Sequence, residues 1–185
     1  MTQLRVEVTN GSEAYYDAIQ QVCDLRFGDG YLTRKTYERW MKCPPLLKTA
    51  LIGGEFAGFA VMLPASTEEI MRHMDMPRAD VLGIAGDQPA LIYQSAAVEP
   101  KYEHCGVMSA MARAGLKQAR EMGYGALFAS AWVYQGQIPI AGTFRAFGFQ
   151  PLYERHMLWY HDENYRCVVC KGRCTCDAVI YYKKL

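Results

Sequence analysis

Residues 90–133 decide the fold of this chain, and they read ALIYQSAAVEPKYEHCGVMSAMARAGLKQAREMGYGALFASAWV. The run 90–98 is mostly apolar, as is typical of a strand buried on both faces. Residues 107–122 place apolar or small side chains at helical spacing, with basic side chains opposite them. Gly123 ends that helix, and residues 126–133 form a second apolar run. A strand, a helix and a strand in this order predict a right-handed parallel crossover.

Weaker patterns predict the elements on either side of this crossover. Gly53-Gly54 lies between two apolar runs and indicates a tight hairpin, because the favoured two-residue turns need positive φ. The other predicted elements are a strand at 4–8, a helix from Ser12 to about Phe27, a helix capped by Thr33, a short helix with a Ser66/Glu69 capping box, a helix at 141–147, and strands at 149–161 and 177–184.

The composition is that of an ordinary globular chain. Of 185 residues, 51% are hydrophobic and 21% are charged, and the length fits one domain spanning residues 1–185. The net charge of +1 predicts no nucleic-acid partner. The longest apolar run, 56–65, is too short to span a bilayer, and the first residues lack the pattern of a secretory signal. We therefore expect a cytoplasmic protein without a membrane partner.

The turn inside the crossover, residues 98–108, has the features of an anion site. A helix that begins after a glycine presents unpaired backbone N–H groups and the positive end of its dipole. Gly106 precedes the helix and would let a pyrophosphate approach the backbone closely. Alone, this pattern favours a plain turn, because most single glycines before helices are only turns.

The same turn resembles the acetyl-CoA loop of the GNAT (N-acetyltransferase) superfamily, which reads V-x-P-x-Y-R-G-x-G-x-G. Val98, Pro100, Tyr102 and Gly106 match it, and AGTFRAFGF at 141–149 resembles the family's later helix that ends in Gly-Phe. The resemblance covers nearly the whole chain. It implies an α/β (α+β) fold with a GNAT-like mixed, mostly antiparallel twisted sheet of about seven strands and helices on both faces.

The resemblance also implies an acyl-CoA-dependent N-acyltransferase, in which an amine attacks acetyl-CoA directly within a ternary complex. The acceptor would be a small-molecule or peptide amine bound by residues 12–42 and 64–89, and a homodimer is compatible with the family. The pantetheine arm would bond to the strand at 96–98, and the pyrophosphate would lie on 103–109. The implied cofactor-binding residues are Ala96, Ala97, Val98, Glu103, His104, Cys105, Gly106, Val107, Met108, Ser109, Gln137 and Phe144.

Five positions depart from the family pattern, the mildest being Gln137 in place of a frequent asparagine after the fifth strand. Glu103 replaces an arginine and adds repulsion toward phosphate, and Met108 replaces the last loop glycine. Phe144 stands where the family has its thiolate-protonating tyrosine, and Gln94 stands near its usual glutamate. Either other groups move the protons, or the chain is a non-catalytic acyl-CoA- or metal-responsive binding module. The candidate proton-transfer residues are Tyr93, Tyr134 and His104.

Cys105 offers a third interpretation. A thiolate at a helix N-terminus is stabilised, and His104 beside it suggests a thiol enzyme. Neighbours in sequence rarely hold the geometry that such a pair needs, so an ordinary loop residue is the favoured reading.

The C-terminal part contains CVVCKGRCTC at 167–176, which we expect at the tip of an antiparallel hairpin. Four soft ligands favour zinc, or alternatively an iron–sulfur cluster, in a closed and therefore structural site. His161 replacing one thiol, disulfides in an oxidising compartment, and free thiols stay as alternatives. The predicted metal ligands are Cys167, Cys170, Cys174 and Cys176.

Overall fold

The computed structural model describes residues 5–185 and contains a seven-stranded sheet in the order β1-β2-β3-β4-β5-β7-β6. Strands β4 and β5 run parallel, and every other pair of neighbours runs antiparallel. The mixed, mostly antiparallel sheet that the sequence predicts is therefore confirmed. The strands are β1 Val6–Asn10, β2 Leu47–Ile52, β3 Glu55–Ala65, β4 Ala90–Val98, β5 Ala126–Trp132, β6 Gln150–Arg155 and β7 Ala178–Lys184.

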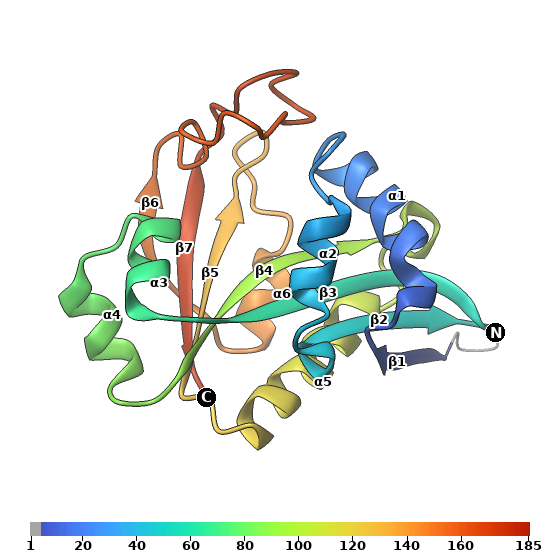
Figure 1. Ribbon diagram of the computed structural model, residues 1–185, viewed down its shortest axis with the longest axis horizontal. Coiled ribbons are helices and arrows are strands. Elements are labelled where there is room, and N and C mark those ends of the chain that lie inside the picture. The colour runs from blue at the N-terminus through green and yellow to red at the C-terminus, as the bar shows by residue number, and fades with distance from the viewer. Residues whose placement is uncertain (1–4) are drawn as a thin grey trace.

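Helices cover both faces of the sheet, as predicted (Figure 1). The crossover helix α5 buries Met111 and Leu116 in the cluster on one face, whereas α1 and α2 bury Ile19 and Trp40 in a separate cluster on the other. Among the described residues, no helix is long and apolar enough to cross a membrane. The helices are α1 Tyr16–Arg26, α2 Arg34–Trp40, α3 Thr67–Met74, α4 Arg78–Ala85, α5 Val107–Glu121 and α6 Ala141–Ala146.

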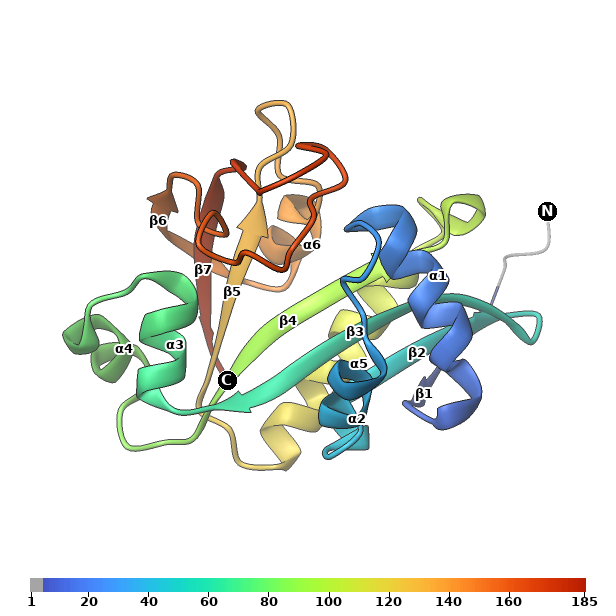
Figure 2. The same ribbon diagram turned by 45° about the horizontal axis from the view of Figure 1, so that its top comes forward.

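Strands β4 and β5 diverge after a short parallel stretch (Figure 2). They pair only from Ala90↔Ala126 to Tyr93↔Ala129. At that point the register between β3 and β4 shifts and leaves Gln94 as an extra residue. Such a bulge bends a strand and increases its twist. Because β5 continues beside β7 as far as Trp132, the β5-facing edge of residues 94–98 has no strand partner among the described residues.

Several local signals act as predicted. Gly53 and Gly54 have φ of +59° and +83°, which suits the two-residue turn between β2 and β3. The Thr33 side chain accepts a hydrogen bond from the Thr36 N–H and caps α2. Ser66 and Glu69 form the capping box of α3, which is worth about 1 kcal/mol.

Other boundaries differ from the prediction. The Ser12 side chain caps nothing, because a 3₁₀ turn precedes α1. Strand β1 lies two residues later than predicted, and Leu4 falls outside the described residues. Helix α4 was not predicted, since its helical spacing gives only one buried residue, Val81.

The largest difference concerns the strand predicted at 149–161. Strand β6 ends at Arg155, because its neighbour β7 begins opposite it at Ala178 and leaves later residues without a ladder. Residues 156–177, hereafter the cysteine loop, therefore form a long connection instead of a tight tip. The loop lies beyond the ends of β5 and β7 and approaches the segment that follows α1 (Figure 2).

Candidate functional site

A cavity of about 580 Å³ lies where β4 and β5 diverge. Its walls include Tyr93 and Ala96 of β4, Trp132 of β5, and Phe144 of α6. Tyr31 closes it from the segment after α1, and the cysteine loop contributes further residues. This volume is typical of a pocket for a small molecule or cofactor arm.

The open edge of β4 offers backbone groups to this cavity. The Glu99 N–H donates to the Ala57 carbonyl in β3 at 2.9 Å. Because backbone groups alternate in direction along a strand, those of Val98 and Ala96 face away from β3, toward the gap beside β5. Ala97 instead turns its backbone toward β3 and buries its side chain against the α1 cluster. Of the three residues predicted here, Ala96 and Val98 have the expected orientation.

The start of α5 is shaped as the glycine predicts. Gly106 is the N-cap, with φ of +79°, and no described atom lies within 4 Å of the position that a Cβ would take. His104 also has positive φ, +61°, so the chain turns sharply before the helix. The first N–H groups of this 15-residue helix have no partner within the helix and no side-chain cap. Val107 is buried beneath the turn, and Ser109 lies in that first turn.

Glu103 does not present an uncompensated charge to this turn. Its carboxylate accepts a hydrogen bond from Arg26 at the end of α1, and the two side chains are 45% and 32% exposed. The same guanidinium donates to the Val98 carbonyl at 3.0 Å. Arg26 thus fastens α1 to the end of β4 and offsets the repulsion that the sequence predicts.

An aromatic cluster lies at the base of the cavity. The Tyr93 ring meets the ring of Phe144 edge-on at 5.8 Å between centroids, and Phe144 stacks on Phe149 at 4.4 Å. The Tyr93 hydroxyl donates to the Met108 sulfur at 3.9 Å, so it lies between the family's tyrosine position and the start of α5. Burial raises the pKa of Tyr93 above its usual 10 and keeps the hydroxyl protonated at neutral pH.

Most of the predicted site residues do not line the cavity, among them Val98, the turn at 103–109, Tyr134 and Gln137. Tyr134 and Gln137 exchange backbone hydrogen bonds of 2.7 and 2.9 Å across a small exposed turn beyond β5. The Tyr134 ring rests against Trp132 and remains 38% exposed. His104 is exposed, and no hydrogen bond joins it to Cys105 within the described part of the chain. The positions therefore favour Tyr93 over Tyr134 and His104, and they do not favour the thiol-enzyme reading.

The structure adds residues that the sequence did not indicate. His73 of α3 and Arg39 of α2 line the cavity beside Gln94. Burial lowers the pKa of His73 below its usual 6.5, Arg39 and Arg72 lower it further, and contacts with Gln94 and Glu69 oppose the shift. Tyr31 and Ser95 hydrogen-bond through their hydroxyls on the same wall. These residues come from four segments, and no local motif connects them.

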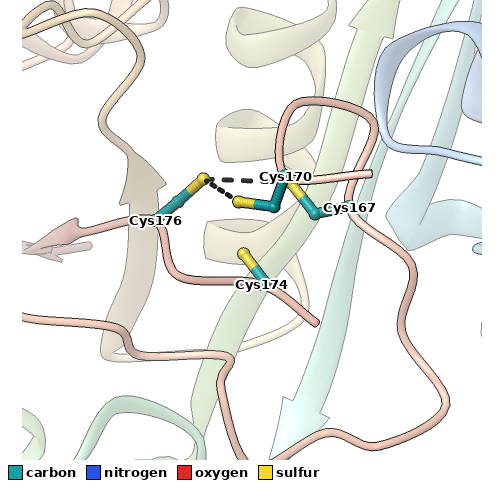
Figure 3. Close-up of side chains that lie close together, drawn as sticks. All are labelled: Cys167, Cys170, Cys174 and Cys176. Carbon is teal, nitrogen blue, oxygen red and sulfur yellow. Dashed lines mark hydrogen bonds between the residues drawn. The ribbon is translucent and has the colours of Figure 1, made fainter. Parts of the chain in front are cut away.

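The four cysteines of the cysteine loop converge (Figure 3). All four sulfur atoms lie within 4.8 Å of one another, with Cys176 at 3.5 Å from Cys170 and 3.8 Å from Cys167. Cys167 and Cys174 are buried, and all seven cysteines of the chain are free. His161 is not part of the group and lies against Tyr160.

The environment of these thiols is not uniform. The Thr175 hydroxyl and backbone N–H hydrogen-bond to the Cys170 sulfur and lower its pKa to about 7. Burial raises the pKa of Cys174 well above its usual value. A metal ion bound here would have to displace the protons of the remaining thiols.

Comparison with known proteins identifies the fold. The profile of the Acetyltransferase (GNAT) family matches residues 13–149. No curated protein matches the sequence. The structure is similar to Ard1 from Thermoplasma volcanium, with 13% identity, a TM-score of 0.68 and 97% of each chain covered.

Two further solved structures share this architecture. The ribosomal-protein-S18-alanine N-acetyltransferase from Escherichia coli has 14% identity and a TM-score of 0.64, over 97% of this chain and 94% of that one. An acetyltransferase from Bacillus subtilis in complex with CoA has 14% identity and a TM-score of 0.63, over 98% of this chain and 99% of that one. At such identities the similarity establishes the fold and leaves the substrate open.

Proposed function

The chain belongs to the GNAT family of acetyltransferases, and we propose that it is an N-acyltransferase that moves the acetyl group of acetyl-CoA onto an amine. The observation that carries this proposal is the divergence of β4 and β5 at the Gln94 bulge, directly beside the start of α5. It leaves an unpaired strand edge and the uncapped first N–H groups of α5 next to one cavity. A long thioester with an anionic end needs both features.

One side of the site, which we call the cofactor half, comprises the open edge at 96–98 and the turn at 103–109. Of these residues Ala96 lines the cavity, and the Tyr93–Met108 contact joins the cavity wall to the turn. We propose that the pantetheine amides form hydrogen bonds with the backbone of Ala96 and Val98, as a neighbouring β-strand would. The pyrophosphate would lie on the N–H groups that follow Gly106, where the helix dipole favours negative charge. Almost all of these contacts use the backbone.

The other side, which we call the acceptor half, comprises Tyr31, Arg39, His73 and Gln94 together with the cavity-lining part of the cysteine loop. We propose that the amine binds there. A histidine with a lowered pKa is neutral at pH 7 and can take a proton from an ammonium group. His73 would fill the role for which the family pattern has a glutamate near Gln94.

The chemistry then needs few groups. The neutral amine attacks the thioester carbonyl, and the tetrahedral intermediate collapses with the sulfur leaving. Tyr93 would donate a hydrogen bond to that sulfur from beside Phe144. A thiol has a pKa of about 8.5, lower than that of Tyr93, so the hydroxyl stabilises the thiolate without giving up its proton completely.

The Phe144 environment favours a second candidate function, a non-catalytic acyl-CoA-responsive module. Phe144 is 2% exposed and packs against Phe149 and Tyr181, and it has no group that can donate a proton. A protein that only binds acetyl-CoA would need no donor there. Location in the cytoplasm and assembly as a homodimer stay predictions.

An acceptor screen tests the proposal. Purified protein would be incubated with acetyl-CoA and a panel of small amines, amino acids and short peptides, and acetylated products would be identified by mass spectrometry. We expect at least one amine to be acetylated faster than in the protein-free control. Binding of acetyl-CoA without any turnover would favour the non-catalytic module. Absence of acetyl-CoA binding would contradict both functions.

A further inference from the structure

We propose that Cys167, Cys170, Cys174 and Cys176 bind one Zn²⁺ ion, and that this ion fixes the cysteine loop as the outer wall of the acceptor half. The metal site does not depend on the proposed function. The description of the wall as part of an acceptor site does.

The sulfur geometry suits a single ion. Four ligands at about 2.3 Å from a tetrahedral zinc lie about 3.8 Å from one another. Two of the sulfur separations here are 3.5 and 3.8 Å, and none of the six exceeds 4.8 Å. Tetrahedral sites made entirely of thiolates select zinc or iron, and oxygen-seeking cations are excluded by ligand type.

The backbone around the first two cysteines forms a tight turn that supports such a site. The Lys171 N–H donates to the Cys167 carbonyl at 2.8 Å, and the Cys167 N–H donates to the Gly172 carbonyl at 3.0 Å. Lys171 adopts positive φ at the turn. The Thr175 N–H points at the Cys170 sulfur at 3.4 Å, as expected for a group that supports a thiolate.

The cysteine loop has little regular structure of its own, so a bound metal ion would add an important structural restraint. Residues 156–177 contain no helix and no named strand, and irregular connections of more than about 15 residues are uncommon in compact domains unless they are functional. Within the described chain, the regular ladders end at Arg155 and resume at Ala178. The four cysteines lie in the C-terminal part of the cysteine loop, just before β7. One bound ion would therefore hold this part of the loop next to the start of β7.

The cysteine loop also reaches across the cavity. The Val168 N–H and the Tyr165 hydroxyl both donate to the Phe27 carbonyl, at 3.2 and 3.1 Å. A Cβ at Gly28 would lie 2.2 Å from the Arg166 carbonyl, so only glycine allows this approach. Phe27 ends α1, on the opposite half of the sheet from β6 and β7.

The metal cluster and the cavity share a residue. Cys174 lines the cavity, and Trp159, Asp162 and Tyr165 of the same loop line it as well. The Tyr165 ring meets the Tyr31 ring edge-on at 5.9 Å. An ion that holds Cys174 in place therefore holds one wall of the acceptor half, whereas the α5 turn lies outside these contacts.

The test combines metal analysis with amide hydrogen exchange. Zinc content would be measured by mass spectrometry for the native protein, for Cys170→Ser and for the matched control Cys43→Ser, a cysteine outside the cluster. We expect one zinc per chain in the native protein and the control, and none in Cys170→Ser. If Cys170→Ser does not fold, native protein stripped with a chelator and reloaded with Zn²⁺ or Co²⁺ replaces it.

Amide hydrogen exchange then tests whether the metal ion fixes the cysteine loop as a wall of the acceptor half. Metal loss should speed exchange at residues 27–31 and 159–168 by about tenfold or more, and metal return should reverse it, with residues 103–109 unchanged. A protein that binds neither Zn²⁺ nor Co²⁺ would overturn the metal site. Faster exchange confined to residues 167–176 would overturn the wall while leaving the metal site intact. Both results are independent of turnover.

Discussion

The two halves of the proposed site differ in the chemical groups that form them. The cofactor half consists of backbone: the unpaired edge of β4 and the N–H groups after Gly106. The acceptor half consists of side chains from α2, α3, β4, the cysteine loop and, with Tyr31, the segment after α1. A site made of backbone tolerates changes of side chain, which explains how Glu103 and Met108 can depart from the family pattern without altering the turn. A site made of side chains has no such tolerance.

The largest effect is expected from a variant that fills the backbone turn of the cofactor half with a large side chain. Gly106→Trp should weaken acetyl-CoA binding more than about a hundredfold, because the ring occupies the space for the pyrophosphate. Gly123→Trp is the matched control at the other end of α5, since Gly123 has φ of +80° and no described atom near its Cβ position. Both variants should lose about 1–2 kcal/mol of stability from the left-handed residue.

Calorimetric titration and thermal unfolding separate the two contributions in that pair. Equal loss of affinity in both variants would mean that general destabilisation, and not the site, is responsible.

The next largest effect is expected in the acceptor half, from removal of the proposed base His73. His73→Gln should lower kcat/KM for the amine by about a hundredfold at pH 7. In the native enzyme the rate should fall as the pH drops through the His73 pKa, which lies below 6.5, because the protonated imidazole cannot accept a proton. The variant should lose that limb of the pH profile. His104→Gln, at the histidine that the sequence suggested, should keep it.

A smaller effect on kcat is expected from a change at Tyr93, which lies between the cofactor half and the acceptor half. Tyr93→Phe removes the hydroxyl beside Phe144 and should lower kcat by roughly tenfold, since one hydrogen bond to the leaving sulfur is lost. The affinity for acetyl-CoA should stay within about twofold of the native value, because the backbone contacts remain. Tyr124→Phe, away from the cavity, serves as the control. An unchanged kcat would remove Tyr93 from the mechanism.

The smallest effect concerns the Arg26–Glu103 ion pair beside the backbone groups of the cofactor half. Arg26→Gln should weaken acetyl-CoA binding by about two- to fivefold by leaving Glu103 uncompensated, and Glu103→Gln should strengthen it to a similar extent. The double variant should return close to the native affinity. A change much larger than this would show that side chains, and not only backbone, build the cofactor half.

The same contrast explains what could be predicted from the sequence. The crossover and the turn at Gly106 follow from helical spacing, an apolar run and a glycine, all of which are local. The cysteine cluster was predictable because its four members lie within ten residues. His73 was not, since its place beside Gln94 depends on how α3 packs against β3 and β5.

The bulge at Gln94 could not be predicted for a related reason. It arises from the pairing of β4 with β3, where Val61 lies opposite Ser95 and Met62 opposite Tyr93. That register is a relation between two strands, and no pattern within β4 reveals it. The Arg26–Glu103 pair likewise joins residues that are 77 positions apart.

The most direct test of the account is the footprint of acetyl-CoA, measured by amide hydrogen exchange with and without the ligand. We predict protection of the amides at Ala96 and Val98 on β4 and at residues 106–109 at the start of α5, with smaller changes in the cysteine loop. Protection confined to the acceptor half, or none at saturating ligand, would contradict the claim that backbone groups of β4 and α5 hold the cofactor.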